Sequence, residues 1–462
     1  MSAIITDPFK KQFMQKILDE VSNLTARYYI GIGKNDEWNA TETVPTPTDT
    51  PKTIREAQNA LQSVKAVAST SFVIPRHNWS SGSEYSGYDD EYTTIPSNTY
   101  YVLTEDNHVY ICLQQSKSGT GTANVSTVKP TGTSPKPFKT SDGYTWRFLY
   151  ALSGTDTSSF LSANFIPVQK IDSDGAATNA FEIQQKAAQD SADAGRIANI
   201  VIENQGSGYD PSSPPTVTIT GNSGAIGDSA QATPFISSGK VVKIDMLNES
   251  AGSGKNFVNA TVTISGGSGS GAVARAVLGP PNGIGADPRD DLKATSLMFN
   301  SKPDGTENGD FLAGTGQDFR QVMLIRNPRT DSANGQILTA TTAKALKYFL
   351  VDSAFATQLQ PDELITSDAT PAGKAYVNEA VNFGDANNMK VYYHQTDSTG
   401  YTPFSVGNLL TDEGGQTGTI EVVADSNELY INTSGEVLYI ENRAPVTRIA
   451  SQTEDIKVVV TL

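Results

Sequence analysis

The sequence predicts a mainly β protein with a few helices, organised in more than one domain. Its 39 glycines and 23 prolines are typical of a chain with frequent turns. Segments in which apolar and polar residues alternate recur between the turn clusters, and such alternation indicates half-buried strands. With 462 residues the chain exceeds the usual size of one domain, so we expect about two to four domains.

Two helices are expected near the N-terminus. Asp7 and Pro8 suit the cap and the first position of one helix. The apolar residues that fall on one face of this helix are Phe9, Phe13, Ile17, Leu18 and Val21. The second helix is expected to begin near Thr53, because Thr53 and Glu56 have the spacing of a capping box. Its apolar stripe, which we expect to contact the core, comprises Ile54, Ala57, Leu61 and Val64.

Short strands with turn signals between them follow. A strand is expected at 27–32, before the second helix. Residues 99–103 and 108–113 are separated by a turn at 105–107, which predicts a hairpin. The aromatic strand at 144–150 follows a stretch of Gly, Ser, Thr, Lys and Pro that we interpret as a long surface loop.

An internal repeat occupies residues 195–279. The two copies span 200–221 and 242–267. Each contains an alternating strand, a Gly-rich turn and a second alternating strand, and each is followed by a run of small residues, at 230–232 and 271–276. One copy is too small to enclose a core, so we expect the two copies to pack on each other. Gly208 and Gly221 are expected to take turn conformations with positive φ.

The last third of the chain is again rich in strand patterns. Residues 389–394 and 417–423 alternate apolar and polar side chains and lie near turn clusters. The segments 436–440 and 456–462 supply two more strands near the end of the chain.

The charge and the apolar pattern narrow the class of partner. A net charge of -16 repels phosphate backbones, which argues against nucleic-acid binding and fits a protein whose partners are other proteins. The first residues do not have the pattern of a signal peptide, and no apolar run approaches the length of about 20 residues that spans a bilayer. We therefore expect neither secretion nor membrane insertion.

No catalytic, cofactor-binding or metal-binding residue is predicted. Cys112 lies in an apolar run and is interpreted as a buried hydrophobic residue. The three histidines are far apart and lack metal-ligand spacing; they are His77, His108 and His394. The run 252–255 has the letters GSGK but lacks the Ser or Thr that follows the Lys of a phosphate-binding loop. We expect that the chain is not an enzyme and has no cofactor, although spacing alone does not exclude a pair of catalytic carboxylates.

Five segments resemble the wedge protein of T-even-type phage baseplates, the one that forms a dimer within each wedge. They read YIGIGKNDEW at 29–38, VIPRHNW at 73–79, DGYTWRFLY at 142–150, FRQVMLIRNP at 319–328 and GEVLYIENRAPV at 435–446. They occur in the same order as in the family and include both ends of the chain. The repeat and the stretch before Gly435 are extra length, so the resemblance implies nothing about them.

The resemblance implies a pair of β-sandwich-like domains with helical insertions, one built from both chain ends. With inserted small β modules added, the expected fold is α+β, mainly β and multi-domain. The predicted end-built domain takes 1–80, 290–334 and 433–462. The middle β domain takes 81–289 and contains the repeat, and 335–432 forms an inserted β-rich module.

The function implied by the resemblance is architectural. A wedge subunit of this kind links neighbouring wedge proteins during baseplate assembly and in the triggering of sheath contraction. Its expected partners are other wedge proteins and a second copy of itself. Its expected location is the virion, in the tail baseplate, after assembly in the host cytoplasm.

Four residues are candidates for partner contacts or for packing. Arg76 and Trp79 flank an extended segment fixed by Pro75, and they suit either stacking against a neighbour or local packing. Glu441 and Arg443 suit either an ion pair within the fold or a contact with a partner subunit.

Two other functions are kept as alternatives. A receptor-binding or carbohydrate-binding virion protein at the baseplate edge would use the Gly-rich repeat and the aromatic surface of the 18 tyrosines. A tail-associated hydrolase that degrades the cell envelope is the third candidate.

Overall fold

The computed structural model confirms a mainly β, multi-domain fold of the α+β class. Strands hold 39% of the residues and helices 12%. The structure describes residues 3–173, 176–221, 230, 232–246, 255–314, 316–330, 335–352, 355–382, 388–424, 430–431 and 433–462. The chain forms two compact units. Unit 1 comprises Met1–Met14, Ser71–Ser296 and Thr461–Leu462, and unit 2 comprises Gln15–Thr70 and Leu297–Val460.

The two units and the predicted domains differ at several boundaries. Residues 1–14, 71–80, 290–296 and 461–462 were expected in the end-built domain and belong to unit 1. The predicted domain boundaries therefore stay a prediction.

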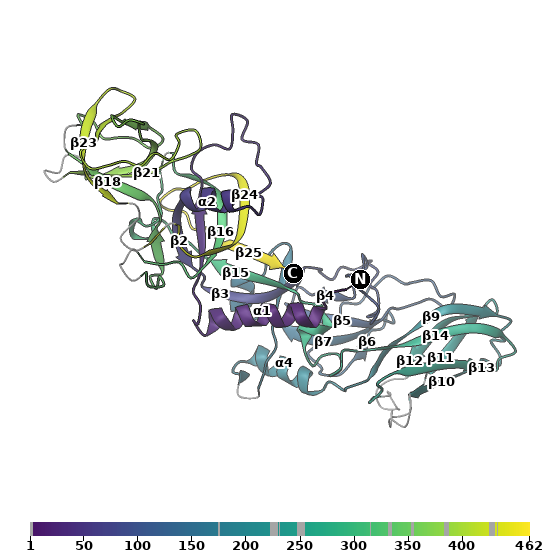
Figure 1. Ribbon diagram of the computed structural model, residues 1–462. Coiled ribbons are helices and arrows are strands. Elements are labelled where there is room, and N and C mark those ends of the chain that lie inside the picture. Colours follow the sequence, from purple (N-terminus) through teal and green to yellow (C-terminus); the bar gives the residue numbers. More distant parts are fainter. Residues whose placement is uncertain are drawn as a thin grey trace. The chain divides into compact units, whose positions relative to one another are not determined.

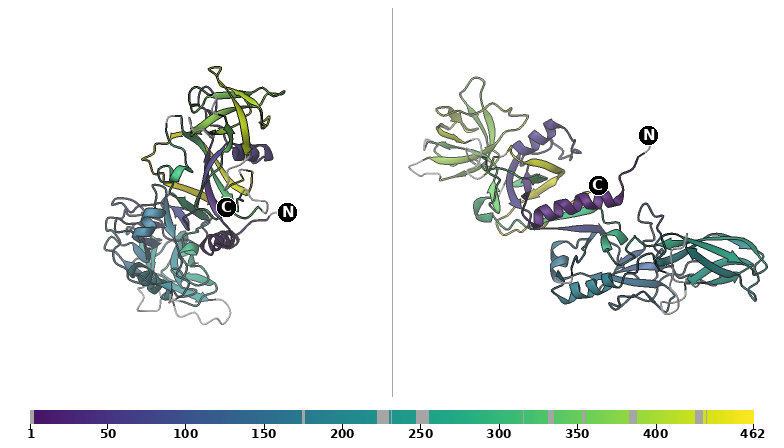
Figure 2. Two further views of the ribbon diagram at one scale, coloured as in Figure 1. Left: turned by 90° about the vertical axis from the view of Figure 1, so that its left-hand side faces the viewer. Right: turned by 60° about the horizontal axis from the view of Figure 1, so that its bottom comes forward.

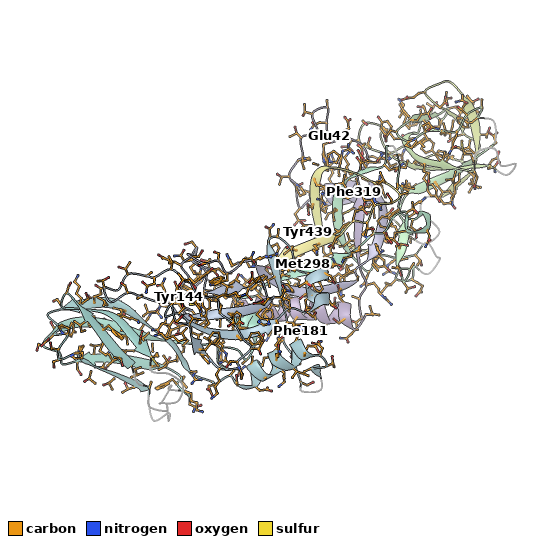
Figure 3. The ribbon with its side chains drawn as sticks, turned by 180° about the vertical axis from the view of Figure 1, so that it is seen from behind. Glu42, Tyr144, Phe181, Met298, Phe319 and Tyr439 are labelled. Carbon is orange, nitrogen blue, oxygen red and sulfur yellow. The ribbon has the colours of Figure 1, made fainter. Side chains whose placement is uncertain are left out.

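Unit 2 contains a five-stranded antiparallel sheet of strands from distant parts of the chain. In spatial order its strands are β17 (Thr342–Lys344), β2 (Leu61–Ala66), β1 (Tyr28–Gly33), β16 (Asp318–Arg326) and β24 (Glu436–Thr447). Leu324 on β16 lies opposite Ile30 on one side and Tyr439 on the other. Segments from both chain ends are thus joined through β16, and Phe319 and Tyr439 mark the paired strands β16 and β24 in Figure 3.

The central strand β1 is buried along its whole length. A Cβ atom on Gly31 would lie 2.6 Å from Leu61 Cδ1, and one on Gly33 would lie 2.4 Å from the backbone oxygen of Ala60. The two glycines therefore allow β1 and β2 to approach closely. The core beside this sheet includes Tyr29, Leu61, Val64, Met323, Ile325, Leu338, Ala343 and Tyr430.

Helix α2 (Pro51–Asn59) corrects the predicted start of the second helix. The cap is Thr50, whose side-chain oxygen accepts a hydrogen bond from Thr53 N at 3.2 Å. The helix starts earlier than expected because Pro51 favours the first helical position. The expected stripe is also shorter, since Leu61 and Val64 belong to β2.

A closed six-stranded barrel is also part of unit 2. Its strands are β18 (Lys347–Val351), β19 (Leu364–Ser367), β20 (Lys374–Val381), β21 (Met389–His394), β22 (Leu409–Thr411) and β23 (Thr417–Ala424). The strands expected at 389–394 and 417–423 are confirmed. Residues 342–344 pair with β2 rather than with the barrel, so the barrel itself is narrower than the module expected at 335–432. The remaining elements of this region are β15 (Ser296–Ser301), its neighbour β25 (Ile456–Thr461) and the short helix η2 (Glu307–Gly309).

The core of unit 1 is a four-stranded antiparallel sheet. Its order is β4 (Tyr101–Leu103), β5 (His108–Gln114), β7 (Thr145–Ala151) and β6 (Phe138–Lys139). Val102 lies opposite Tyr110, which confirms the expected hairpin. Tyr144, labelled in Figure 3, is buried beside this sheet with Trp146. The other elements are β3 (Ser69–Pro75), its partner β8 (Phe165–Val168), and the helices α3 (Gly154–Ser159), α4 (Ala180–Asp190) and α5 (Pro288–Asp291).

Helix α1 (Asp7–Ser22) confirms the first expected helix but begins at Asp7, the residue expected as its cap, one position before Pro8. Its apolar stripe is covered in part, because Ile17, Leu18 and Val21 are half-buried. Met14 is buried, whereas Phe9 and Phe13 are exposed.

The repeat forms a module in which each copy supplies partners to the other. Its strands are β9 (Ile197–Ser207), β10 (Thr216–Gly221), β11 (Ala232–Ser237), β12 (Lys240–Met246), β13 (Ala260–Ser265) and β14 (Ser270–Leu278). The first strand of each copy pairs with the third of the other, as β9 with β14 and β11 with β12. The middle strands pair so that Thr218 faces Thr263, its equivalent in the repeat. The expectation that the two copies pack on each other is confirmed, and the strands are seen in Figures 1 and 2.

The two glycines singled out in the repeat differ. Gly208 has a φ of 79°, as expected. Gly221 does not have a positive φ, so this expectation was wrong. The reason is that Gly221 is paired in the ladder as the last residue of β10, opposite Ala260. Residues 252–254 of the rejected phosphate-loop motif lie outside the described residues.

Candidate interaction surfaces

Strand β24 carries two of the residues predicted for partner contacts. Glu441 and Arg443 are two positions apart on this strand, and side chains two apart in a strand point to the same side of the sheet. Both residues are half-buried. Because β24 is at one end of its five-stranded sheet, these side chains lie near a strand edge, where partner chains commonly bind.

Both side chains line a hollow of about 360 Å³, which we call the β24 hollow. Its apolar lining comprises Phe319, Val322, Val446, Ile456 and Val458. Its charged lining comprises Glu441, Arg443, Glu454, Asp455 and Lys457. A lining that combines apolar and charged residues is found in many protein–protein contact surfaces.

The charged groups of the β24 hollow differ in how they are paired. Lys457 Nζ lies 2.7 Å from Asp455 Oδ2. Glu441 accepts a hydrogen bond of 3.1 Å from the Tyr439 hydroxyl. Burial, and then the nearby Glu441 carboxylate, raise the pKa of Tyr439 to about 12. The Arg443 guanidinium forms no ion pair within the described part of the chain, so the ion pair considered for Glu441 and Arg443 is not formed.

Arg448 fixes the chain just after β24. Its guanidinium binds the Glu454 carboxylate through two contacts of 2.7 and 3.0 Å, and both side chains are buried. It also donates to the backbone oxygens of Leu312 at 2.9 Å and Gly305 at 2.7 Å. The hollow is therefore held by a buried, fully bonded ion pair.

A second surface lies at the N-terminus of the chain, in unit 1. Ile4, Ile5, Phe9 and Phe13 are 86, 63, 59 and 47% exposed, and we call them the α1 patch. Four large apolar side chains within about ten residues leave an apolar surface that water does not favour, and such patches mark contact sites. Their sequence pattern was evident, but their exposure was not.

Arg76 and Trp79 are engaged locally in unit 1. Arg76 donates from Nη1 to the backbone oxygen of Ser162 at 2.8 Å and from Nε to Asn78 Oδ1 at 2.9 Å. Trp79 donates from its indole nitrogen to Ser126 Oγ at 3.1 Å and packs against the aromatic core. These contacts describe local packing, the second of the two roles considered for this pair.

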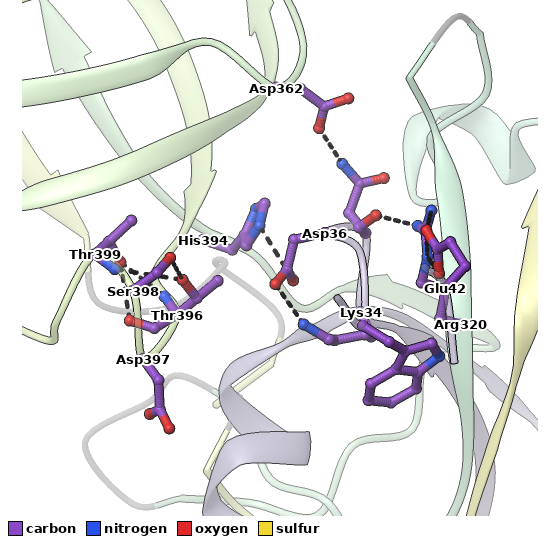
Figure 4. A network of polar contacts seen from close by, with 12 residues as sticks. Lys34, Asp36, Glu42, Arg320, Asp362, His394, Thr396, Asp397, Ser398 and Thr399 are labelled. Atoms are coloured by element: carbon purple, nitrogen blue, oxygen red, sulfur yellow. Dashed lines mark hydrogen bonds and ion pairs between the residues drawn. The ribbon is translucent and has the colours of Figure 1, made fainter. Parts of the chain in front are cut away.

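A polar network in unit 2 fixes the loop that follows β1. The buried guanidinium of Arg320 binds both carboxylate oxygens of Glu42, with contacts between 2.6 and 3.1 Å, and lowers the pKa of Glu42. Asn35 donates to Asp362 Oδ1 at 2.6 Å and accepts from Asp318 N at 3.0 Å. These residues, shown in part in Figure 4, hold the loop against β16 and the barrel.

A second part of this network surrounds Asp36, which has contacts with Lys34 and His394 in Figure 4. The nitrogen Nε2 of His394 lies 3.7 Å from Asp36 Oδ1, and Nδ1 lies 2.6 Å from Asn378 Oδ1. Burial lowers the pKa of His394 to about 4 although Asp36 opposes the shift. The imidazole is therefore neutral at pH 7. Sequence reasoning missed the contact between Asp36 and His394 because these two residues are hundreds of positions apart.

The remaining chemical candidates form no site. Cys112 is fully buried, as expected, and burial raises the pKa of its thiol. Among the described residues, no group of three or more His, Cys, Asp or Glu side chains is arranged to hold a metal ion. No helix in the described ranges has the length and apolar character to cross a membrane.

No family model and no curated protein matches this chain.

Proposed function

We propose that this chain is a structural subunit of the baseplate wedge of a contractile phage tail. It would link neighbouring wedge proteins during assembly and while sheath contraction is triggered. Its partners would be other wedge proteins and a second copy of the chain, and its location would be the virion.

The observation that carries the proposal is the placement of the segments that resemble the wedge family. Three of them, at 29–38, 319–328 and 435–446, supply the adjacent strands β1, β16 and β24. These three segments are far apart in the sequence, yet they lie side by side in one sheet. Three of the five resembling segments therefore meet in one sheet, while those at 73–79 and 142–150 contribute to β3 and β7 of unit 1.

Two surfaces support an assembly role. The β24 hollow combines an apolar lining with Arg443, whose guanidinium forms no ion pair among the described residues, and the α1 patch exposes four large apolar side chains. An Arg beside apolar side chains is a common anchor of protein interfaces. A subunit that contacts several neighbours needs more than one such surface.

The carbohydrate-binding alternative has less support. Its main argument was the aromatic surface of the 18 tyrosines. Most of these tyrosines are buried in the cores of the two units, so they do not form a stacking surface for sugars.

The location of the chain in a virion tests the proposal. An antibody against the purified chain should label the baseplate end of a contractile tail, with the label within the plate. Label only at fibres or at the outer edge of the plate would favour a receptor-binding protein, and its absence from the virion would refute the proposal.

Self-association is tested separately. We propose that the two copies of the chain contact each other through the α1 patch. An obligate homodimer is expected to bury about 2,000 Å² or more in total. Light scattering of the purified chain at micromolar concentration should give the mass of a dimer, and Phe9→Ser combined with Phe13→Ser should give a monomer.

The matched control changes two exposed apolar residues of another helix. Phe181→Ser combined with Ile183→Ser alters α4, where both side chains are exposed, and should leave the dimer intact; Phe181 is labelled in Figure 3. A monomeric wild-type chain would contradict self-association.

A further inference from the structure

A groove in unit 2 is lined by acidic side chains and is distinct from the β24 hollow. It has a volume of about 500 Å³, and its walls are the loop after β1, helix α2 and the barrel loop at 395–401. Four carboxylates line it, and we call it the acidic groove: Asp36, Glu37, Glu56 and Asp397.

The positive charges at the acidic groove do not balance these carboxylates. Lys34 forms an ion pair with Asp36. Lys52 is shared, with Nζ 3.1 Å from Glu56 Oε1 and 3.4 Å from Asp397 Oδ2. Among the described residues, four carboxylates thus face two ammonium groups, so the groove favours a cation.

A buried hydrogen-bond acceptor also lines the groove without a donor. Gln321 is 5% exposed, and its oxygen Oε1 has no hydrogen-bond partner within the described residues. Its orientation is fixed by neighbours: Asn442 donates to the backbone oxygen of Pro45 at 2.9 Å, and the Asn442 oxygen accepts from Gln321 Nε2 at 2.8 Å. Asp36 Oδ1 is a second buried oxygen without a hydrogen bond. Buried acceptors of this kind are costly unless a ligand or water donates to them.

Aromatic rings complete the acidic groove. The Trp38 indole is fixed by its hydrogen bond of 2.9 Å to the backbone oxygen of Arg443, and Lys34 Nζ lies 5.3 Å from its ring centroid. Tyr401 is exposed and donates to Asp397 Oδ1 at 3.0 Å. The groove already places one cation over an aromatic ring, which is the contact a guanidinium also favours.

We propose that the acidic groove binds an arginine-bearing extended segment of another protein. A guanidinium is always charged and presents five N–H donors in one plane. It can donate to Gln321 Oε1 and to the carboxylates while its flat face lies against Trp38 or Tyr401. A neutral sugar would supply donors but would leave the excess negative charge unbalanced. These features do not depend on the proposed function of the chain.

Binding of short peptides to the full chain tests this inference. The probe is an acetylated and amidated Gly-Arg-Gly-Arg-Gly peptide carrying a fluorophore, followed by anisotropy at physiological ionic strength. Asp397→Asn removes one exposed carboxylate from the groove and should weaken binding by about threefold to fivefold. Glu421→Gln is the matched control, because Glu421 is exposed on the barrel and does not line the groove.

The NMR resonance of the Trp38 indole N–H gives a second measurement that does not rely on a variant. It should shift on addition of the peptide, while the signals of Trp79 and Trp146 stay unchanged. Equal weakening by Asp397→Asn and Glu421→Gln would overturn the proposal, since it would indicate diffuse attraction to an acidic chain. Absence of peptide binding, or displacement of the peptide by methyl glucoside, would also overturn it.

Discussion

The repeat module of unit 1 and the five-stranded sheet of unit 2 are built in opposite ways. In the module, both copies lie in one continuous stretch and pair with each other. The sheet instead draws β1 and β24 from the two ends of the chain and joins them through β16. Even its loop contacts are distant, since Arg27 N donates to Asn327 Oδ1 across 300 positions.

This difference shows how a chain can gain residues without disrupting the sheet that joins its two ends. A local, self-paired module needs few contacts with the rest of the chain, so it is the kind of unit that is tolerated as an insertion. A sheet made from both chain ends has no such independence, because the loss of one strand uncovers the core shared by the others. We therefore expect a destabilising change in the sheet to lower the stability of all its strands, and one in the module to affect only the nearby strands.

The largest loss of stability is expected from a substitution of Arg448, which lies in unit 2 with the five-stranded sheet. Arg448→Met leaves the buried Glu454 carboxylate without its partner, which should destabilise unit 2 by about 3–5 kcal/mol. Hydrogen exchange of the β24 amides at increasing urea concentration measures the loss.

The control for Arg448 is an ion pair on the surface of the same sheet. Arg326 pairs with Glu436, which is largely exposed, at 3.0 Å, and Glu436→Gln, which leaves the second ion pair of Arg326 with Glu20 in place, should cost about 0–1 kcal/mol. Equal effects of the two variants would break the claim that the buried pair holds β24.

The next largest effect is a loss of stability at low pH, which arises at the contact between the barrel and the loop after β1. The pKa of His394 is lowered to about 4 in the fold, against about 6.5 in an unfolded chain. The unfolded state therefore binds more protons below pH 6.5, and stability should fall by roughly 3 kcal/mol as the pH drops from about 6.5 to 4.

A variant isolates this pH dependence. His394→Gln should remove most of the loss of protection in β21 between about pH 6.5 and 4. His108→Gln is the control. Burial lowers the pKa of this half-buried residue while the nearby Asp106 opposes the shift. This variant should leave the pH profile of β21 unchanged. An unchanged pH profile in His394→Gln would show that another group controls it.

A smaller and more local effect is expected in the repeat module. Gly208 has a φ of 79°, so Gly208→Val forces a β-branched residue into the left-handed region at a cost of about 1–3 kcal/mol. The loss should be confined to β9 and β14. Gly119→Val, in an exposed loop without a positive φ, should stay within about ±0.5 kcal/mol. A neutral Gly208→Val would contradict the need for glycine in this turn.

Local patterns made the module and many strands predictable from the sequence. The alternation at 389–394 and 417–423 is a property of neighbouring residues, so both strands were found. The error at Thr53 arose because Thr50 and Thr53 both suit a cap, and Pro51 decided between them through its fixed φ.

Contacts between distant segments were not predictable. The barrel closes because β18 pairs with both β21 and β23, and no local pattern encodes that closure. Arg320 and Glu42 are 278 positions apart, so their ion pair had no sequence signal. Glu441 and Arg443 were singled out through the resemblance, whereas the acidic groove was missed because three separate segments form it.

Hydrogen exchange of a chain that lacks residues 436–462 tests most directly that the two chain ends form one frame. Removal of β24 and β25 should abolish protection of the β1 amides at Tyr28–Gly33, because β1 shares its sheet and core with β24. The amides of β9 and β14 should keep the protection that they have in the full chain. Unchanged protection of β1 in the shortened chain would contradict the common frame.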